Sequence, residues 1–556
     1  MAAAEDSSQF DILVIGAGLS GISCLYHTRR LFPSWRVKVF EAADEVGGTW
    51  YFNRYPGARF DSEAVSYHLS WDKEFLAQWN WSEEFAAQPE ILRYIQAFCD
   101  KNDTRRDVQF NTRITHANWN EESRLWLLTD DKGARYSTRF LITGVGILSA
   151  PQLPNIPGIS SFKGQAYHTS RWPRDFDMAR DLKDKRIGVI GTAATGIQTI
   201  TAISKEPGIK SLTVFQRTAS WSAPLRNTPI SPERMAQYKT QYDSIFQQCA
   251  EAPQGFLYGP DPRNTFDVPE EERIALWEKL YSERGFGKWM GLFKDTYTDP
   301  VANKAYSDWI ADKIRSRVHD KVLAEKLIPT DHGFGTKRVP LESGYFEAFN
   351  QPNVHLVNLR ETPITTVTPS GILTADGREH ELDILVFATG FDAITGALAG
   401  IDWTGKDDRP LFETGNSDKD NLAIWADNET VTFLGLMAPS LPNTFMILGP
   451  HQPFGNIPRS IENSVNVVMG LLQFVKANGY TYVEPRQEAA DAWYEHVVEC
   501  SKGLLSSEIS GWATGVNTNV EGKSRRRVAK YSATYRQFLD KCEEAEKAGW
   551  TSLYLQ

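Results

Sequence analysis

Several features that mark whole classes of protein are scarce in this sequence. Its 556 residues include five cysteines, which lie far apart with no Cys-x-x-Cys pair and no accompanying pair of histidines. This spacing argues against a disulfide framework, a zinc site and a dithiol redox centre, so no metal site is expected. Isolated thiols are typical of buried side chains in a reducing compartment, which favours a cytoplasmic protein.

Long apolar stretches are also missing. No uninterrupted apolar run reaches the roughly 18 residues that a membrane-spanning helix needs. The first ten residues, MAAAEDSSQF, include acidic residues and lack the apolar core of a signal peptide. We therefore expect a soluble, cytoplasmic protein without a membrane anchor, and a monomer or a weak dimer.

The sequence has no excess of basic residues. Lys and Arg total 60 against 70 for Asp and Glu, which gives a formal net charge of −10. Proteins that bind nucleic acids carry a basic surface patch, so no polynucleotide partner is expected. Hydrophobic residues make up 41%, which is typical of a folded protein, and at about 150 residues per domain the length allows several domains.

A glycine-rich motif follows a short apolar run near the N-terminus. Gly16, Gly18 and Gly21 form the pattern G-x-G-x-x-G, and a helical stretch and a second β-rich run follow. In such a βαβ unit the glycines permit a tight turn, close approach of a pyrophosphate and close helix–strand packing, while the helix N-terminus attracts phosphate. Glu41 lies 20 residues past Gly21, where an acid accepts hydrogen bonds from ribose hydroxyls. The motif therefore predicts dinucleotide binding, with an ordinary βαβ turn as the alternative.

The same order of strand, glycine-rich turn, helix and strand recurs once. The second turn runs from Gly191 through Ala193 to Gly196, and it has alanine where the first motif has Gly18. The added methyl group is expected to hold the phosphates slightly farther from the backbone. Two dinucleotide-binding units in one chain indicate an electron donor and an electron acceptor that meet.

The residues after the second strand of this unit differ from those of the first. Where the first unit has Glu41, the second has Arg217 and Thr218. A cation at this position suits a 2′-phosphate, whereas an acid repels it, so NADPH is favoured over NADH. FAD at the first site and NADPH at the second is the natural pairing. A structural arginine is the alternative for Arg217.

The sequence also indicates how the chain divides between the two units. Two strand-like runs, 140–144 and 382–390, both end in Thr-Gly, as expected if two crossings of the chain between the units meet there. We interpret them as the points where the chain leaves and re-enters the first unit. Residues 224–334 are charged, aromatic and patterned as helices. The predicted fold class is α/β, with two Rossmann-like dinucleotide-binding domains, for FAD and NADPH, and a helical insertion in the NADPH domain. The expected domains are residues 1–145 and 386–556 for FAD, the latter with a C-terminal loop region, 146–223 and 335–385 for NADPH, and 224–334 for the insertion.

Two longer strings resemble the sequence fingerprints of one enzyme family. Residues 162–173 read FKGQAYHTSRWP and fit F-x-G-x-x-x-H-x-x-x-W-(P/D), and residues 47–61 fit (A/G)-G-x-W-x-x-x-x-(F/Y)-P-(G/M)-x-x-x-D. Over almost its whole length the chain is similar to class B flavoprotein monooxygenases, and specifically to Baeyer–Villiger monooxygenases. The fixed positions of the first fingerprint are Phe162, Gly164, His168, Trp172 and Pro173.

Three shorter strings add to this resemblance. Residues 334–340 resemble the segment with the family's catalytic arginine, 449–462 a flavin-side segment, and 511–517 the region of a mobile-loop tryptophan. After Asn517 the chain departs from the commoner form of that loop and reads TNVEGK, which includes Glu521. This departure bears on the loop and the substrate pocket, and the expected reaction class is unchanged.

The resemblance implies an enzyme that inserts one oxygen atom of O2 next to the carbonyl of a ketone, giving an ester or a lactone. The oxidant would be a C4a-peroxyflavin formed from NADPH-reduced FAD. Arg338 would stabilise the peroxide anion and the oxyanion of the tetrahedral adduct, because its guanidinium is permanently charged. Asp61 would orient that guanidinium. A structural salt bridge is the alternative for both residues.

Matching motif positions also imply contacts to the cofactors. Lys337 would lie with Arg217 and Thr218 around the 2′-phosphate, and Trp512 would touch the nicotinamide side. The residues expected to bind FAD or NADPH (NADP+) are Gly16, Gly18, Ser20, Gly21, Glu41, Thr49, Trp50, Asp61, Tyr67, Ile457, Arg59, Gly191, Thr192, Thr195, Gly196, Gln198, Arg217, Thr218, Lys337, Arg338 and Trp512.

Other interpretations of the same motifs stay open. A flavin monooxygenase that oxidises nitrogen or sulfur shares the F-x-G-x-x-x-H stem, but Trp172, Pro173 and Arg338 favour ketone oxidation. A disulfide or quinone reductase built on two dinucleotide domains is a second alternative, and the missing Cys-x-x-Cys disfavours only its disulfide form. Arg338 with Asp61 disfavours a non-catalytic nucleotide-sensing protein. His168 is interpreted as coupling domain position to cofactor binding rather than as an acid–base catalyst. Linear, cyclic and polycyclic ketones are all candidate substrates.

Overall fold

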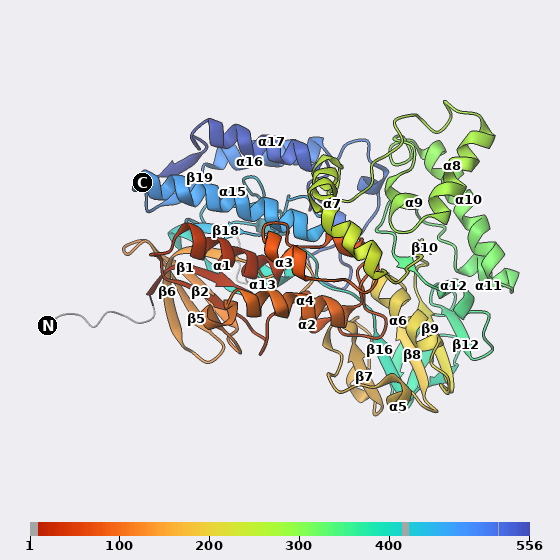
Figure 1. Cartoon of the computed structure of the whole chain (residues 1–556). Coiled ribbons are helices and arrows are strands. Elements are labelled where there is room, and N and C mark those ends of the chain that lie inside the picture. The colour runs from red at the N-terminus through yellow and green to blue at the C-terminus, as the bar shows by residue number, and fades with distance from the viewer. Residues whose placement is uncertain (1–8, 414–421, 521) are drawn as a thin grey trace.

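The computed structural model describes residues 9–413, 422–520 and 522–556. Residues 1–8, which hold most of the N-terminal sequence considered above, residues 414–421 and Glu521 lie outside the described residues. Figure 1 shows that the chain forms two units, each built on its own sheet. The first unit is the part around the eight-stranded sheet, and the second unit is the part around the five-stranded sheet.

The first unit contains a mixed sheet in the order β17-β4-β5-β6-β1-β2-β3, with β18 also paired to β6. Successive side chains of β1 point to opposite faces, so Ile12 and Val14 join one core while Leu13 and Ile15 join another. Helices α1 and α15 pack together over the first of these cores. The strands are Gln9–Ile15 (β1), Val37–Phe40 (β2), Val108–Gln109 (β3), Ile114–Asn120 (β4), Leu125–Asp130 (β5), Arg135–Thr143 (β6), Asp402–Thr404 (β17) and Thr444–Met446 (β18).

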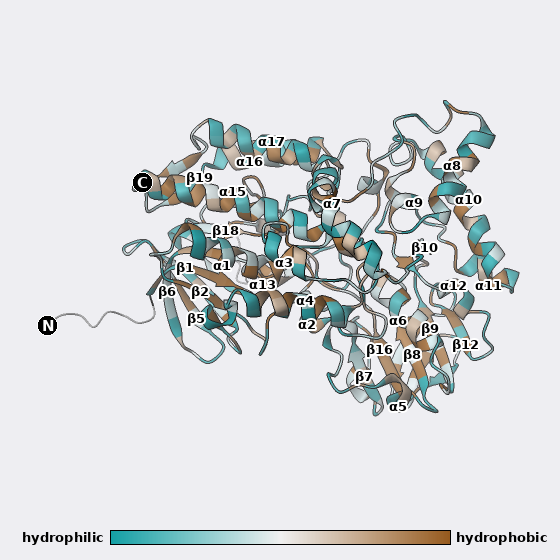
Figure 2. Cartoon of the chain, viewed as in Figure 1, coloured by the Kyte–Doolittle hydropathy of each residue, from teal (hydrophilic) through white to brown (hydrophobic). Residues whose placement is uncertain are grey.

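The second unit contains a parallel sheet in the order β12-β9-β8-β16-β7. Its strands are mostly brown in Figure 2, as expected for a parallel sheet buried on both faces. Strand β16 ends at Phe387, opposite His168 and Ile190. The domain boundary expected after residue 385 therefore falls inside this strand. The strands are Gln165–His168 (β7), Arg186–Ile190 (β8), Ser211–Gln216 (β9), Val354–Asn358 (β12) and Ile384–Phe387 (β16).

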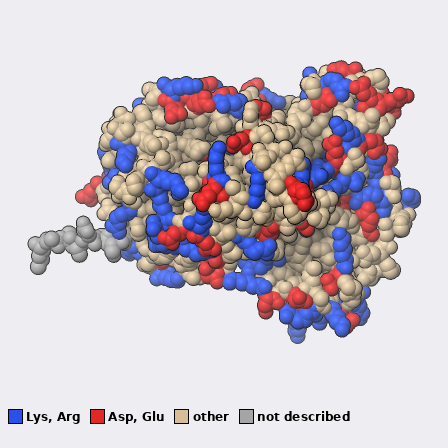
Figure 3. Space-filling model, in the orientation of Figure 1, with Lys and Arg blue, Asp and Glu red and all other residues tan. Residues whose placement is uncertain are grey.

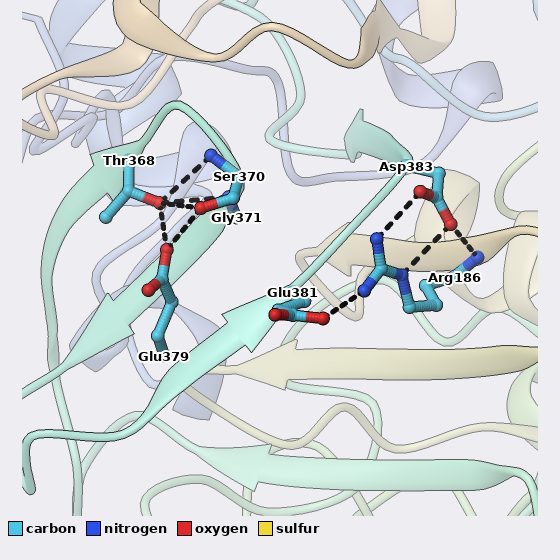
Figure 4. A network of polar contacts seen from close by, with 7 residues as sticks. All are labelled: Arg186, Thr368, Ser370, Gly371, Glu379, Glu381 and Asp383. Carbon is cyan, nitrogen blue, oxygen red and sulfur yellow. Dashed lines mark hydrogen bonds and ion pairs between the residues drawn. The ribbon is translucent and has the colours of Figure 1, made fainter.

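A small antiparallel sheet is attached to this parallel sheet by a polar network. It consists of β13 (Ile364–Thr368), β14 (Gly371–Thr374) and β15 (Glu379–Glu381). Figure 4 shows Arg186, at the start of β8, donating a hydrogen bond of 2.9 Å to Asp383 and pairing with Glu381. In the same view the Thr368 and Ser370 hydroxyls donate to Glu379. These contacts hold the chain in place just before it enters β16.

The insertion expected over residues 224–334 is helical, and its helices divide between the two units. Helix α7 buries Met235, Tyr238 and Tyr242 in the core of the first unit, whereas Trp277 and Tyr306 of α8 and α10 lie in the core of the second. Figure 1 shows α7 beside α17, apart from α8 and α10. The helices are Pro232–Glu251 (α7), Glu270–Ser282 (α8), Gly287–Met290 (α9), Pro300–Arg317 (α10) and Lys321–Lys326 (α11).

The remaining helices cover the sheets or lie in the loops between them. In the first unit, α15, α16 and α17 lie side by side above the sheet in Figure 1, and β19 pairs with β20 at their end. Helix α6 packs against β8 and β9 of the second unit. These elements are Leu19–Leu31 (α1), Thr49–Phe52 (α2), Lys73–Gln78 (α3), Gln88–Lys101 (α4), Met178–Asp181 (α5), Ala194–Ser204 (α6), Tyr345–Ala348 (α12), Gly396–Ala399 (α13), Ile457–Ala477 (α15), Gln487–Glu499 (α16), Tyr535–Lys547 (α17), Ala223–Pro224 (β10), Leu341–Glu342 (β11), Val483–Pro485 (β19) and Leu553–Leu555 (β20).

The described residues contain neither a helix able to cross a membrane nor a cluster able to hold a metal ion. Among the helices in residues 9–413, 422–520 and 522–556, none combines the length and the apolar character that a membrane crossing requires. The same residues contain no cluster of three or more His, Cys, Asp or Glu side chains that could hold a metal ion. On the face shown in Figure 3, basic and acidic side chains are interspersed.

Candidate active site

The first glycine turn joins β1 to α1 and has the geometry expected of a phosphate-binding turn. Gly16 adopts a positive φ of 100°, and a Cβ on it would lie 2.6 Å from the carbonyl oxygen of Gly144. A Cβ on Gly21 would collide with the carbonyl oxygen of Gly16. No side chain caps the N-terminus of α1 and no acid lies in its first turn, which contains Ser20. The exposed helix N–H groups therefore suit an anion.

Glu41 lies at the end of β2, beside this turn, and is buried. Its two carboxylate oxygens accept hydrogen bonds from the backbone N–H groups of Ala17 (2.7 Å) and Ala43 (2.8 Å). Burial raises the pKa of Glu41, and these two N–H donors oppose the rise. The sequence placed this acid next to the glycine turn, and the structure brings the two together.

The second glycine turn joins β8 to α6 and repeats this geometry. Gly191 has a φ of 105°, and a Cβ on Gly196 would collide with the carbonyl oxygen of Gly191. Ala193 adopts φ −83° and ψ −168°, close to the −76° and −172° of Gly18. The alanine therefore leaves the backbone of the turn unchanged, and its methyl group affects only the space above the turn.

The polar residues around the second turn gather at the ends of β9 and β12. The Thr192 hydroxyl donates to the Thr218 carbonyl oxygen (2.9 Å), and Thr195 is 3.4 Å from Thr169 through their hydroxyls. Arg217 is exposed just past β9. These positions agree with those expected around a dinucleotide at the carboxyl edge of a parallel sheet.

Arg360 is a further cation at this edge, and the sequence motifs did not indicate it. Its Nη2 lies 3.4 Å from the Thr218 hydroxyl and pairs with Asp331 at 2.6 Å. Although burial acts to raise the pKa of Asp331, the hydrogen bond from His332 and the charges of Lys337 and Arg360 hold it below its usual value. Lys337 thus interacts electrostatically with Asp331, the carboxylate that Arg360 pairs with beside Thr218. The available signal was that Arg360 follows β12 as Arg217 follows β9, its neighbour in the sheet.

Arg338 and Asp61 form an ion pair between segments far apart in the sequence. Nη2 of Arg338 lies 2.9 Å from Oδ2 of Asp61; the side chain of Arg338 is 39% exposed and that of Asp61 only 1%. The Leu341 N–H also donates to Asp61 at 3.3 Å. Burial raises the pKa of Asp61, and the Arg338 charge opposes the rise. The carboxylate is therefore fixed in the interior, while the guanidinium it holds stays open to a ligand.

Aromatic residues near this pair form a compact wall. The Trp50 indole N–H, at the start of α2 after Thr49, donates to the Tyr67 hydroxyl at 2.9 Å. The Tyr67 ring stacks on Phe60 with centroids 4.6 Å apart. Ile457 begins α15 and packs on the same core. Such rigid apolar surfaces suit the flat face of an aromatic cofactor.

Gln198 of α6 connects the second unit to the loop before Asp61. Its amide oxygen accepts from the Tyr55 hydroxyl (2.7 Å), and its amide nitrogen donates to the Arg59 carbonyl oxygen (3.1 Å). Gly57 makes the close approach possible, because a Cβ there would lie 2.6 Å from the Gln198 carbonyl oxygen. Gln198 was expected to bind a cofactor; the structure shows that it also joins the two units.

The two chain crossings between the units meet, as their Thr-Gly endings suggested. Pro151 and Phe391 form an antiparallel bridge, and the Gln152 N–H donates to the Gly390 carbonyl oxygen at 3.0 Å. His168 lies at the same point: its Nε2 donates to the Gly390 carbonyl oxygen (3.1 Å), while its Nδ1 accepts from the Ser170 N–H (3.2 Å). Burial lowers the pKa of His168 to about 4. The imidazole is therefore neutral and fully engaged in holding the crossing.

The rest of the first fingerprint supports the position of His168. Trp172 is buried and lies against the rings of Tyr167 and Phe176. A Cβ on Gly164 would lie 2.5 Å from the Asp383 carbonyl oxygen, so this glycine allows the chain to pass β16 closely. Phe162 packs on the neighbouring core, and Pro173 follows Trp172.

Trp512 is not brought into contact with the other candidate residues. Its side chain is 39% exposed, and in the described part of the chain it makes no hydrogen bond or ring contact. The loop that follows is attached to the crossings: Asn517 donates to the Phe391 carbonyl oxygen (3.2 Å), and Lys523 pairs with Asp392 (2.6 Å). The departure from the family pattern after Asn517 includes Glu521, which lies outside the described residues.

Comparisons with known proteins identify the family. The model of the flavin-binding monooxygenase-like family matches residues 10–228. The chain is 42% identical to the 2-oxo-Delta(3)-4,5,5-trimethylcyclopentenylacetyl-CoA monooxygenase of Pseudomonas putida over 97% of both chains. It is 38% identical to a Baeyer-Villiger monooxygenase of Pseudooceanicola batsensis, covering 98% of this chain and 96% of the relative. The solved structure of OTEMO in complex with FAD and NADP matches with a TM-score of 0.91 at 40% identity, covering 98% of this chain and 99% of that chain. The chain therefore belongs to the Baeyer–Villiger monooxygenases, as the fingerprints predicted.

Proposed function

We propose that this protein uses FAD and NADPH to insert one oxygen atom of O2 next to the carbonyl of a ketone, giving an ester or a lactone. The observation that carries the proposal is the half-exposed Arg338, held by the buried carboxylate of Asp61 at 2.9 Å. Family membership and the two glycine turns support the same reaction. On this proposal Arg338 and Asp61 are the residues of the reaction centre.

The residues of the first unit fit FAD. Gly16, Gly18 and Gly21 leave space that side chains would fill, and α1 offers uncapped N–H groups for a pyrophosphate. Glu41 lies where ribose hydroxyls are recognised, and the wall of Trp50 and Tyr67 suits a flat ring. Bound FAD, once reduced, supplies the activation of O2 that no side chain can supply.

The residues of the second unit fit NADPH. The turn from Gly191 to Gly196 matches the first turn in geometry, and the exposed cation Arg217 follows the next strand. Lys337 and Thr218 lie close to Asp331 and Arg360 on the same edge. The cations Arg217, Lys337 and Arg360 outnumber the acid Asp331 at this edge, which favours a 2′-phosphate.

Arg338 and Asp61 have separate tasks in this proposal. Arg338 holds a permanent positive charge at the point where negative charge develops on oxygen during the insertion, which is electrostatic preorganisation. Asp61 occupies one nitrogen of the guanidinium and leaves the others to donate. The bonds from Gln198 to the same loop allow the second unit to influence this geometry.

We also propose the domain division given above, with the boundary moved to after Phe387, and a cytoplasmic monomer or weak dimer without a nucleic-acid partner. The five cysteines are free, and four of them are buried, which supports a reducing compartment. The formal charge of −10 supports the absence of polynucleotide binding.

The test is product analysis with the purified, FAD-loaded protein, NADPH and O2. We expect ε-caprolactone from cyclohexanone, detected by gas chromatography. Sulfoxide from thioanisole without any lactone would instead support the heteroatom-oxidising alternative, and a protein that retains no flavin would refute the proposal.

The corresponding variant is Arg338→Ala. Lactone formation should fall by about 10²–10³-fold, because one charge that stabilises the transition state is lost. Flavin content should be unchanged, because no contact of Arg338 holds the first glycine turn. Arg338→Lys keeps the positive charge but loses the planar guanidinium group, so its activity should lie between those of the wild-type protein and Arg338→Ala. Unchanged lactone formation by Arg338→Ala would remove Arg338 from the reaction centre.

A further inference from the structure

A cavity of about 300 Å³ lies beside α16 and the turn that follows Trp512. Its walls include Tyr494 of α16, Thr514 of the turn and the segment from Arg525 to Lys530. None of the residues expected to contact FAD or NADPH lines it. The reaction proposed above therefore leaves this cavity without a role.

The cavity is strongly basic. Four cations line it, namely Arg525, Arg526, Arg527 and Lys530, against one acid, Glu429. The carboxylate of Glu429 accepts a hydrogen bond from the Tyr494 hydroxyl at 2.7 Å. Arg526 pairs with Glu508, which lies outside the cavity walls, at 3.2 Å.

Three of these cations lack a compensating partner. In the described part of the chain, Arg525, Arg527 and Lys530 form no ion pair and donate no side-chain hydrogen bond, and Nε of Arg527 is buried without a partner. Burial lowers the pKa of Lys530. Uncompensated charges that converge on one cavity repel one another and are costly to desolvate, so an anion that neutralises them would bind favourably.

The chemistry of the walls selects among anions. Guanidinium groups donate paired hydrogen bonds to phosphate oxygens, and hydroxyls that donate no bond within the protein supply further donors. In the described structure the hydroxyls of Ser506 and Ser532 donate no hydrogen bond, whereas those of Ser501, Ser507 and Thr514 donate to backbone carbonyl oxygens. A volume near the lower end of the range for small-molecule sites suits a phosphate group with a short attachment rather than a macromolecule.

We propose that this cavity binds a phosphate-bearing small molecule. The ligand places its phosphate among Arg525, Arg527 and Lys530, beside Thr514 of the Trp512 turn. The phosphate arrives either on the substrate, as a thioester tail of coenzyme A would carry it, or on a separate ligand. Both sources share the same recognition chemistry.

The segment 525–531 joins this cavity to the Trp512 turn and to the segment 449–462. The Arg527 N–H donates to the Thr514 carbonyl oxygen at 2.8 Å, which joins the segment to the Trp512 turn. On the other side, the Tyr531 N–H donates to the Gln452 carbonyl oxygen at 3.1 Å, within the segment 449–462. An anion that orders the basic segment therefore also orders the turn that carries Trp512.

Isothermal titration calorimetry tests the proposal with pyrophosphate as the probe. The protein is loaded with FAD and saturated with NADP+, so that the two dinucleotide sites are filled. We expect saturable binding that weakens at higher ionic strength. Arg527→Gln and Lys530→Gln should each weaken it about tenfold or more, the loss of one charge-assisted hydrogen bond.

Two further variants make this test decisive. Arg525→Gln removes an exposed cation whose side chain forms no ion pair or hydrogen bond in the described structure, so weakened binding by this variant does not depend on the stability of a buried site. Arg378→Gln is the matched control, because Arg378 is also exposed, forms no ion pair in the described structure and does not line the cavity. No saturable binding to the wild-type protein, or equal affinity in all variants, would overturn the proposal. Binding of pyrophosphate does not depend on oxygenation, so this experiment tests the cavity separately from the proposed function.

Steady-state kinetics then identify the source of the phosphate. If pyrophosphate competes with a keto-acyl coenzyme A thioester and leaves the KM for cyclohexanone unchanged, the cavity holds the tail of the substrate. If pyrophosphate changes kcat with cyclohexanone, the ligand is separate and acts through the Trp512 turn. Either result must be lost in Arg527→Gln for the cavity to be its origin.

Discussion

The two glycine turns of this protein differ at the middle glycine of the motif and share nearly the same backbone conformation there. Gly18 and Ala193 have nearly the same φ and ψ, so the middle position does not set the shape of the turn. The difference lies in what approaches it: a Cβ on Gly18 would lie 3.4 Å from the Cα of Gly48, whereas Ala193 is exposed. The first and third glycines are needed to form the turn. The residue at the middle position determines how closely another segment or a ligand can approach the turn.

The largest effect should come from the third glycines. Gly21→Ala introduces a methyl group that collides with the Gly16 carbonyl oxygen, so α1 must move away from β1 and the protein should lose FAD. The cost is that of overpacking, about 1–3 kcal/mol in the free energy of unfolding. Flavin absorbance after gel filtration and the Tm measure both effects.

Gly196→Ala is the matched variant in the second unit. Its methyl group collides with the Gly191 carbonyl oxygen, so reduction of the flavin by NADPH should fail while FAD is retained. If either variant lost both cofactors, the two turns would not be independent sites.

A smaller effect on nucleotide binding is expected from Arg217, which lies where the first unit has Glu41. Arg217→Gln should weaken NADPH binding about 10–100-fold, the loss of one charge-assisted hydrogen bond to the 2′-phosphate, and leave NADH binding unchanged. Rates of flavin reduction by the two nucleotides measure the preference. An unchanged ratio of NADPH to NADH would exclude Arg217 from the 2′-phosphate site.

Arg360 should contribute less, because Asp331 already neutralises part of its charge. We expect Arg360→Gln to raise the KM for NADPH by about 2–5-fold at low ionic strength, and by less at physiological salt. A Lys326→Gln variant, in which the cation of another exposed ion pair in the same unit is removed, serves as the control. An equal change in the KM for NADPH in Lys326→Gln would indicate that the overall charge of this unit, rather than a local contact of Arg360, affects NADPH binding.

The smallest effect is expected at Ala193, the middle position at which the two glycine turns differ. Ala193→Gly removes one exposed methyl group without changing the backbone, so the affinity for NADPH should rise by about 2–5-fold with no loss of Tm beyond that of one helix-flanking glycine. The reciprocal Gly18→Ala, opposite Gly48, should lower the FAD content. An affinity that fell in Ala193→Gly would mean that the methyl group makes a contact of its own.

The features predicted from the sequence are those whose cause is local. Strand, turn and helix around Gly16 and Gly191 follow from short-range patterns, and residues 224–334 form helices as their pattern predicted. The meeting of the two crossings was also predicted, because both end in the same dipeptide at the end of a strand.

The features missed are those that depend on packing between distant segments. The pattern of α7 predicts a helix but not which core receives its apolar face, and that face lies on the first unit. Arg360 carries no motif, and it reaches Thr218 only because β12 lies next to β9. The basic cavity likewise needs α16 and the segment 525–530 to meet, which no local pattern encodes.

The bridge between Pro151 and Phe391 has a mechanical consequence. Two separate linkers would let the units swivel freely, but here the linkers are hydrogen-bonded into a short two-stranded ribbon, with His168 fastened to its edge. Such a ribbon bends across its flat face more readily than it shears, because shearing breaks the Gln152–Gly390 bond. Any rotation of the units should therefore follow one axis, and the loop from Asn517 to Lys523, attached to the same ribbon, should turn with it.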